Sequence, residues 1–291
     1  MRRFGIIPWA TALALGVFLM GQVCANAQTA PQSPQKQKKA AASAKPAAPE
    51  TLTLEPKAIE ILKATSARLA AAHTLSFTAV ETFESLSRQG APLVYANKFE
   101  VTMQRPDKLK VILAGDGPVS EFYDDGKTVM AYSPAENLVA ITDAQPTIDK
   151  TLESVFHSAA IYFPFTDIIV TDPYGDMAPG LKHAYYVGQS KILGGVTTDI
   201  VAFAGDGIFA EIWVGTEDKL PRGIHAIYLD DPNHLRHNLI FSNWQIDPAV
   251  TDDAFTSSAA ANAKHIPFAN PSAKPGPGAR PPTRTNPSQS Q

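Results

Sequence analysis

The sequence predicts a mainly β protein with some α structure: a half-open antiparallel β-barrel of about 10–11 strands, lidded by helices. Short segments between residues 75 and 246 alternate apolar and polar residues at the two-residue period of a strand, and turn residues separate them. Helical periodicity occurs only before the first of these segments and in one insertion midway. Nothing alternates β with α as parallel crossovers do, so an antiparallel sheet curled into an open barrel is the expected architecture.

The expected helices are few and lie at two places in the chain. Pro56 suits the first turn of a leading helix over about 56–72, in which apolar residues recur at helical spacing. Thr147 is a suitable N-cap for a second helix, whose apolar stripe runs from Ile148 to Ala159 and includes Phe156. A short helical stretch begins at Pro164, so the insertion is predicted to hold two helices.

Turn residues divide the rest of the folded region into strands. After His73 the period switches to two, and the turn at 88–92 separates the first two strands. The expected strands cover approximately residues 75–84, 93–103, 108–113, 119–124, 127–133, 137–142, 183–192, 196–205, 209–215, 222–229 and 236–246.

The first residues are typical of a secretory signal peptide. Met1–Arg3 is a charged start, the apolar stretch from Ile6 to Met20 is too short for a spanning helix, and Ala25-Asn26-Ala27 fits small-x-small cleavage. We therefore expect export to the periplasm of a Gram-negative bacterium, cleavage near Ala27 and a mature chain that does not span the membrane. Cys24 raises the alternative of a lipoprotein, although Val23 is larger than the residue expected before a lipidated cysteine. Cleavage at Ala27 removes this only cysteine and with it all thiol and disulfide chemistry.

Composition divides the remaining chain into three parts. Residues 28–52 form a linker rich in Pro, Ala and Lys, and residues 257–291 form a Pro-rich tail; both are expected to be disordered. Residues 53–256 are expected to form the half-barrel domain. The segment 51–256 contains 15 Lys and Arg against 27 Asp and Glu, a net charge of −12. This acidic body argues against nucleic-acid binding, which relies on neutralising phosphates.

One stretch, Gly126-Lys127-Thr128, resembles the end of a phosphate-binding P-loop. The first glycine of that motif would stand at position 121, which is Glu121, and β-favouring residues follow where the motif requires a helix. Asp124 and Asp125 precede it, but neighbouring residues of a strand point to opposite faces. The sequence therefore predicts a type I′ hairpin turn at Asp125-Gly126 and no nucleotide site.

The cluster Asp230, Asp231, His234 and His237 is the other candidate for chemistry. Pro232 and Asn233 mark a turn there, and no helix places the two histidines on one face, so loop histidines are the interpretation we favour. No G-x-S-x-G or H-E-x-x-H motif is present. We expect no catalytic residue, no metal site and no cofactor; a hydrolase or metalloenzyme would require Asp230, His234 and His237 to converge on a cavity.

Six strings along the chain carry a family resemblance over about residues 55–248. The order of helix, strands, helical insertion and further strands resembles the LolA/LolB-type lipoprotein-carrier superfamily, and is more similar still to a group of predicted periplasmic proteins of unassigned function. The strings are QRPDKLKV, FYDDGKTVMAYSP, YFPFTDII, VGQSKILGGVTTDIVAF, EIWVGTEDKLPRGI and SNW. The resemblance implies an unclosed barrel, lidded by the helices at 56–72 and 147–170, that holds acyl chains without catalysis. It also implies a cargo-handling role for Arg105, while Thr198 departs from the cysteine common at its position.

If the sheet curls, aromatic and apolar residues spread over many strands line its concave face and form the candidate cavity. The members of this set are Phe77, Tyr95, Phe99, Met103, Phe122, Tyr132, Phe156, Phe203, Trp213 and Tyr228. An ordinary packed core remains the alternative for the same residues. Two functions are left open: a carrier that sequesters a lipid, a lipoprotein or another amphiphile, and an envelope interaction or stress-sensing module that holds a partner polypeptide.

Overall fold

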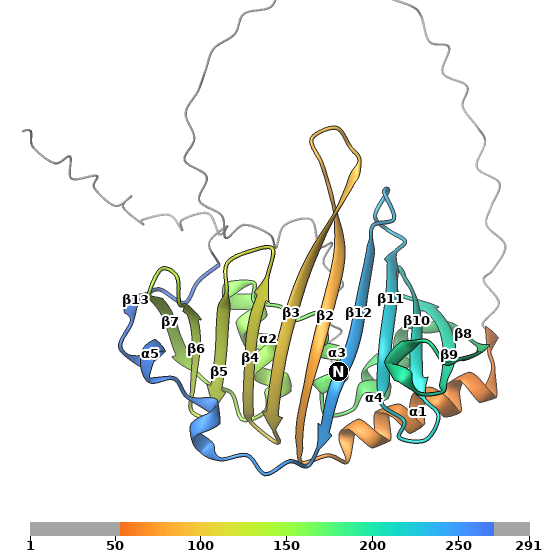
Figure 1. Ribbon diagram of the computed structural model, residues 1–291, viewed down its shortest axis with the longest axis horizontal. Helices are drawn as coiled ribbons and strands as arrows, with labels where there is room; N and C mark the ends of the chain where they lie inside the picture. Colours follow the sequence, from red (N-terminus) through yellow and green to blue (C-terminus); the bar gives the residue numbers. More distant parts are fainter. Residues whose placement is uncertain (1–52, 271–291) are drawn as a thin grey trace, which may run out of the picture.

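A computed structural model describes residues 53–270, which form one 13-stranded sheet with helices on one face (Figure 1). The strand order is β1-β8-β9-β10-β11-β12-β2-β3-β4-β5-β6-β7-β13, and the two ends of the series do not pair. Every pairing between neighbours is antiparallel except the two at the ends, where β1 joins β8 and β13 joins β7 in parallel. The predicted mainly β, half-open barrel fold is therefore confirmed.

The eleven expected strands all form, and two short strands that the sequence did not predict complete the sheet. The eleven are β2 (Thr74–Leu86), β3 (Pro92–Gln104), β4 (Lys108–Gly115), β5 (Ser120–Asp125), β6 (Thr128–Ser133), β7 (Leu138–Asp143), β8 (Leu181–Ser190), β9 (Thr198–Gly205), β10 (Ile208–Gly215), β11 (Pro221–Tyr228) and β12 (Arg236–Ile246). The additional two are β1 (Thr53–Leu54) and β13 (Lys264–Ile266), which are too short to show an alternating pattern.

Four helices cover one face of the sheet, which we call the helix-covered face; the opposite side is the outer face. They are α1 (Pro56–Ala70), α2 (Ile148–Ala159), α3 (Thr166–Ile169) and α4 (Pro173–Met177). The Thr147 side chain accepts a hydrogen bond from the Lys150 backbone N–H (3.3 Å), as an N-cap should, and α2 ends where Ala160 adopts the left-handed conformation.

The helical insertion, residues 144–180, holds α2, α3 and α4, so the prediction of two helices there was one short. The missed helix α4 begins with Asp172, whose side chain accepts from the Gly175 N–H, followed by Pro173 at the first helical position. Ser66 of α1 links the leading helix to this end of the insertion. Its hydroxyl donates to Asp172 (3.3 Å) and accepts from the Tyr174 N–H (2.9 Å).

The folded domain extends beyond residue 256, which corrects the predicted boundary of the tail at 257. Helix α5 (Ser258–Ala261) packs on the outer face beside β6 and β7, where Ala260 is fully buried and Ala263 nearly so, and β13 extends the sheet along the edge of β7. Small side chains let this segment approach Tyr123 and Met130 closely. The sequence did not predict this packing, because the segment is rich in Ala and polar residues. The predicted signal peptide (1–27), the linker (28–52) and the tail beyond 270 lie outside the described residues.

The turn after β5 differs in detail from the predicted hairpin. Of its residues only Gly126 has a positive φ (84°), whereas a type I′ turn needs two such residues in succession. Asp125 instead accepts hydrogen bonds from the backbone N–H groups of Lys127 (2.9 Å) and Thr128 (2.7 Å). A Cβ at position 126 would meet Asp107 Oδ2 at 2.7 Å, so both conformation and space favour glycine there.

Candidate ligand-binding site

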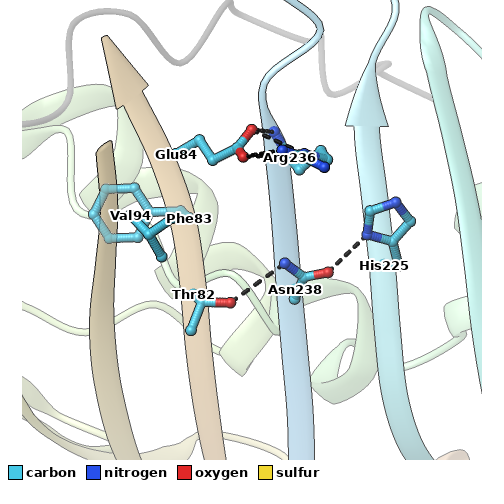
Figure 2. A pocket seen from close by; sticks show the side chains of 7 residues that line it. All are labelled: Thr82, Phe83, Glu84, Val94, His225, Arg236 and Asn238. Atoms are coloured by element: carbon cyan, nitrogen blue, oxygen red, sulfur yellow. Dashed lines mark hydrogen bonds and ion pairs between the residues drawn. The ribbon is translucent and has the colours of Figure 1, made fainter. Parts of the chain in front are cut away.

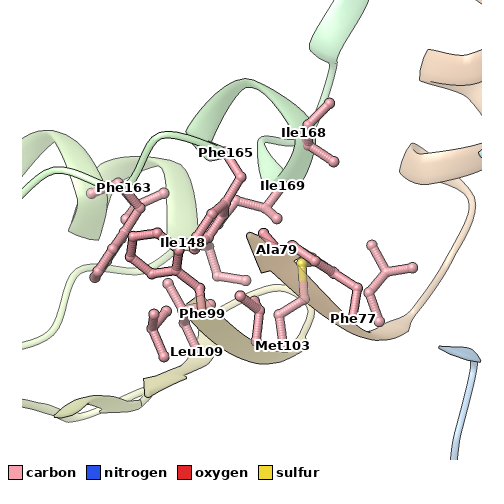
Figure 3. Close-up of a cluster of buried hydrophobic side chains, with 14 of the residues drawn as sticks. Phe77, Ala79, Phe99, Met103, Leu109, Ile148, Phe163, Phe165, Ile168 and Ile169 are labelled. Carbon is pink, nitrogen blue, oxygen red and sulfur yellow. The ribbon is translucent and has the colours of Figure 1, made fainter. Parts of the chain in front are cut away.

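The central strands direct large apolar side chains towards the helical insertion because alternate residues of a strand share a face (Figure 3). Phe77 of β2 stands opposite Val101 of β3, and Ala79 opposite Phe99, so both strands contribute to one apolar surface. All four side chains are at most 3% exposed. Met103, Leu109, Val111 and Phe122 extend this surface across β3, β4 and β5.

Two phenylalanines of the insertion, Phe163 and Phe165, fill the space above this surface, and we call them the phenylalanine pair. Their rings stack on one another at 5.6 Å between centroids. Phe165 meets the edges of Phe77 (5.5 Å) and Phe99 (5.3 Å), and Phe163 meets Phe122 (5.3 Å). Phe165 is fully buried. In this conformation side chains of the protein itself therefore occupy the place predicted for a ligand chain.

Arg105, at the end of β3, holds the insertion in place. Its guanidinium Nη2 donates to the carbonyl of Val170, immediately after α3, at 3.0 Å. Its Nε is buried and has no hydrogen-bond partner among residues 53–270. Burial lowers the pKa of Arg105, while the charge of Asp149 acts in the opposite direction. Asp149 itself accepts from the Thr171 N–H (3.1 Å), so both contacts fix the chain just beyond α3.

The predicted cavity residues fall into four groups. Phe77, Phe99, Met103 and Phe122 are buried under the insertion, and Phe203 lies on the same face beneath α1. Tyr95 and Tyr228 lie at one end of that face. Phe156 contacts His157 and Tyr162 beside the buried stripe of α2.

The prediction was wrong for the last group, Tyr132 and Trp213, which point to the outer face. Tyr132 packs with the α5 residues, and Trp213 follows Ile212, whose side chain faces α1. These two residues therefore cannot line a cavity on the helix-covered face.

Four rings form a continuous line across β3, β2, β12 and β11 at the same end of the face, and we call them the aromatic row. Tyr95 stacks on Phe83 at 5.6 Å, Phe83 stacks on His237 at 5.8 Å, and Tyr228 meets His237 edge-on at 5.2 Å. The three residue pairs follow from neighbouring strands whose side chains share a face. Sequence reasoning placed Tyr95 and Tyr228 in the site and left Phe83 out of that set; it interpreted His237 as a loop histidine, whereas His237 lies on β12.

Two carboxylates lie next to the aromatic row. Glu81 is 3% exposed; its Oε2 accepts from Asn97 Nδ2 (2.9 Å), and its Oε1 lies 3.6 Å from His237 Nδ1. Asp167 of α3 is exposed and acts electrostatically on Tyr162 and Tyr228. Surrounding protein, and then the charge of Asp167, raise the pKa of Tyr162 well above its usual value and likewise that of Tyr228. Tyr162 is nevertheless 38% exposed, so its side chain keeps contact with solvent.

The outer face carries a small hollow of about 120 Å³ over β3, β2, β12 and β11 (Figure 2). His225 Nδ1 donates to the side-chain Oδ1 of Asn238 (2.7 Å), and Asn238 Nδ2 donates to the hydroxyl of Thr82 (3.3 Å). Arg236 forms a bidentate ion pair with Glu84, and this hydrogen-bonded pairing lowers the pKa of Glu84. A second hollow of about 360 Å³ lies between the β2–β3 hairpin tip and the loop before β12.

The two histidines of the cluster Asp230, Asp231, His234 and His237 lie in different surroundings. His237 faces Glu81 within the sheet, whereas His234 lies in the loop before β12 with a left-handed backbone. Within residues 53–270 no group of three or more His, Asp or Glu side chains is arranged to hold a metal ion. In the same part of the chain no helix is both long and apolar enough to cross a membrane.

The fold and the site together define a half-open, mainly β barrel with an apolar inner face closed by a helical insertion. The chain belongs to the family described as Predicted periplasmic protein (DUF2092), whose model matches residues 58–269. This confirms the resemblance to a group of periplasmic proteins and the predicted location. No curated protein has a significantly similar sequence.

Solved structures with a similar fold are distant. A crystal structure of MucB is 16% identical, with 71% of this chain and 64% of that chain covered and a TM-score of 0.37. The MucA/MucB complex of Pseudomonas aeruginosa is 16% identical, covers 70% and 62% of the two chains and has a TM-score of 0.39. This chain thus spans less than two thirds of both. A LolA superfamily protein from Nitrosomonas europaea is 11% identical, with coverage of 69% and 97% and a TM-score of 0.29.

Proposed function

We propose that this protein is a non-catalytic binding module that holds the acyl chain of a lipid, a lipoprotein or another amphiphile against the helix-covered face. The observation that carries the proposal is the phenylalanine pair. A broad apolar surface of the sheet is closed by side chains from an insertion whose middle helix, α3, has only four residues. Short helices gain little stability from their own hydrogen bonds, so their position depends on this packing.

The free energies of the open and closed arrangements are comparable in size. Exposing the four insertion side chains Phe163, Phe165, Ile168 and Ile169 would cost about 6–12 kcal/mol, at roughly 1.5–3 kcal/mol for each. Burying an acyl chain contributes about 0.8 kcal/mol per CH₂, so some 8 to 15 methylene groups offset that cost. A chain of ordinary lipid length can therefore replace the phenylalanine pair without any catalytic group.

The contacts of Arg105 suggest a role in this replacement of the phenylalanine pair by an acyl chain. Its hydrogen bond to the Val170 carbonyl stabilises the closed insertion and would be lost when the insertion moves away. The guanidinium would then be free to bind an oxygen of the cargo. This agrees with the cargo-handling role implied by the family resemblance.

A reversible crosslink tests the proposal directly. Replacing Ser66 and Asp172, whose side chains are in hydrogen-bond contact, with cysteines allows a disulfide to fix the insertion to α1. The chain's only cysteine is Cys24, so a protein made without residues 1–27 contains no competing thiol. We expect a fluorescent fatty acid to bind the reduced variant and the unmodified protein alike, and to bind the oxidised variant at least about tenfold more weakly.

The two single-cysteine variants are matched controls, because they lose the same side chains but cannot form the crosslink. Equal affinity in the oxidised and reduced states would contradict movement of the insertion. Failure of any acyl probe to bind, together with no lipid in native mass spectra of protein purified from the periplasm, would contradict acyl binding itself.

A second function is favoured by a different region, the tip of the β2–β3 hairpin. This tip extends beyond its neighbours, since β4 ends opposite Asn97 and β12 begins only near Phe83 (Figure 1). Leu86, Leu93 and Val94 are 42–65% exposed there. Apolar side chains on a projecting hairpin suit an interaction with a partner polypeptide, and a defined partner in a pull-down would support that function.

A further inference from the structure

The tip of the β2–β3 hairpin leaves one edge of β2 without a neighbouring strand (Figure 1). β12 begins at Arg236, and its first residue paired with β2 is His237, opposite Phe83. β2 continues beyond this point to Leu86, which pairs with Pro92 of β3. On the side of Leu86 that faces away from β3, the described residues therefore provide no strand.

The backbone groups of Leu86 point to this open side. Ser87 N–H donates to the Ala91 carbonyl at 2.8 Å, so Ser87 directs its backbone groups towards β3. Successive residues of a strand direct their N–H and C=O groups to opposite sides, so those of Leu86 face away from β3. Pro92 agrees with this arrangement, because it stands opposite Leu86 and has no N–H to donate. A strand edge with exposed N–H and C=O groups is a template for pairing with another chain.

The hollow of about 360 Å³ lies along this open side, and we call it the edge groove. Arg236, the first residue of β12, donates its backbone N–H to the Glu84 carboxylate (3.1 Å), and the pairing of β12 with β2 goes no further. The groove is lined by Glu84, Leu86, Gly90 and Pro92 of the hairpin and by Asn233, His234, Leu235 and Arg236 of the facing segment. The edge groove thus lies where β12 would continue beside β2.

The other edge of the hairpin, on β3, is protected against such pairing. Asp116 covers it at Ala96: the Asp116 N–H donates to the Ala96 carbonyl (3.0 Å), and the Asp116 carboxylate accepts from the Ala96 N–H (2.8 Å). Nearer the tip stands Pro92, which has no N–H to offer to a strand on that side. Proline and side-chain charges are common means of protecting an edge. The edge of β2 has no proline between Phe83 and Ser87, so it is the more suitable of the two.

The charges near the edge groove favour a basic partner. Arg236 is neutralised by its bidentate ion pair with Glu84. Asp230 and Asp231 belong to the same loop as the groove wall, and neither forms an ion pair with a lysine or arginine within residues 53–270. The net charge of −12 over residues 51–256 also attracts a basic segment and repels an acidic one.

We propose that the open edge of β2, residues 84–87, binds an extended basic segment of a partner polypeptide as an additional strand. The proposal rests on the second proposed function, a partner polypeptide at the hairpin tip, and adds the mode of recognition and the charge of the partner. Hydrogen bonds to the backbone of Leu86 provide affinity, and contact with Leu86 and Leu235 selects an apolar side chain. Because side chains alternate along an extended segment, the best partner alternates basic and apolar residues.

Three fluorescently labelled peptides of six residues test the mode of recognition on the protein lacking residues 1–27. The first alternates lysine and valine, the second alternates glutamate and valine, and the third is the lysine–valine peptide with every amide N-methylated, so that it donates no backbone hydrogen bond. We expect the first to bind at least about tenfold more tightly than either of the others, as measured by fluorescence anisotropy.

Two substitutions at one position separate backbone pairing from side-chain contact. Leu86→Pro removes the N–H that faces the edge groove and leaves the hydrogen bond between Ser87 and Ala91 in place, whereas Leu86→Ala removes the same side chain and keeps the N–H. We expect Leu86→Pro to weaken binding of the lysine–valine peptide at least about tenfold, and Leu86→Ala to weaken it at most about threefold. Both variants should keep the urea midpoint and the fatty-acid affinity of the unsubstituted protein, because proline is tolerated at an edge whose N–H faces solvent.

The outcomes separate this inference from the proposed functions. Equal binding of the N-methylated peptide, or equal weakening by Leu86→Pro and Leu86→Ala, would overturn the additional strand and leave apolar contact at the hairpin tip intact. Equal binding of the glutamate peptide would overturn the basic partner. A dimer of this chain that Leu86→Pro abolishes would assign the edge to a second copy and overturn the partner segment. If Leu86→Pro does not fold, the N-methylated peptide still decides the question on the unsubstituted protein.

Discussion

The two ends of the helix-covered face differ in what fills the space between sheet and helices. Under α2 and α3 the phenylalanine pair packs edge-to-face on Phe77 and Phe99, and the space is occupied. At the aromatic row the facing side chains are Tyr162 and Asp167, which keep contact with solvent. The same sheet therefore has a dry end and a wet end, and the difference between them comes from the side chains that the insertion contributes to each.

Each end also contains one buried carboxylate, and their surroundings differ. Asp124, at the dry end, is fully buried beside Leu109 and Val129; its Oδ1 accepts from the Gly126 N–H, but Oδ2 is buried without a partner among the described residues. Glu81, at the wet end, has Asn97 and His237 nearby. Burial of Asp124 at the dry end therefore costs free energy of folding, whereas Glu81 at the wet end has polar neighbours that offset the cost of its burial.

Truncating the phenylalanine pair should have the largest effect on the dry end. Phe165→Ala removes a fully buried ring that contacts Phe77, Phe99 and Phe163, so we expect a loss of about 3–5 kcal/mol in the free energy of unfolding. Urea denaturation followed by circular dichroism measures it. Phe156→Ala is the matched control, because Phe156 is only partly buried and lies outside the main apolar cluster. Equal losses in the two variants would mean that the insertion is not held by the phenylalanine pair.

Asp124→Asn should have an intermediate effect whose size depends on pH. Burial raises the pKa of Asp124 to about 6, above its value in the unfolded chain. The folded state therefore binds the proton more tightly, and the stabilisation that protonation provides is present below about pH 4 and lost as pH rises through about 6. The neutral variant does not lose it, so we expect Asp124→Asn to exceed the unsubstituted protein by about 1–3 kcal/mol at pH 7.

The measurement is the difference in unfolding free energy between the two proteins at several pH values from 4 to 7.5. We expect the difference to grow with pH over this range and to level off above about 7. The exposed Asp143→Asn variant controls for the general effect of removing one negative charge. A difference that stays constant with pH would show that Asp124 titrates alike in the folded and unfolded states.

The alternation of apolar and polar residues, with turn residues between the segments, was enough to predict eleven strands, since most of them have one buried and one more polar face. Ile148, Leu152 and Val155 likewise identified α2 because the period of 3.6 residues repeats over three turns. The secondary structure of a long periodic element can therefore be predicted from its own residues. The strand order and the open barrel then follow from hairpin connections between neighbours.

The orientation of two site residues could not be read in the same way. Tyr132 stands on β6, where Val129 faces the helices and Met130 and Tyr132 face α5, so both faces are apolar. Trp213 shares the outer face of β10 with Phe209 and Glu211, while Ile212 and Val214 face α1. Where large apolar residues occur on both faces, the pattern does not indicate which side is inward. The filling of the cavity by Phe163 and Phe165 was also hidden, since it depends on contacts between segments about 60 to 90 residues apart in the sequence.

The smallest effect on stability is expected outside both ends, at the hairpin tip. Val94 is 65% exposed, so Val94→Thr, which keeps the β-branched shape, should change the free energy of unfolding by less than about 0.5 kcal/mol. Fatty-acid binding should be unchanged, because Val94 points to the outer face. A loss above about 1 kcal/mol would mean that the tip packs against something in the free protein. If the variant instead kept its stability and its fatty-acid affinity but lost binding to a polypeptide partner, the tip would carry a separate interaction. Ligand binding would then be the role of the dry and wet ends of the helix-covered face.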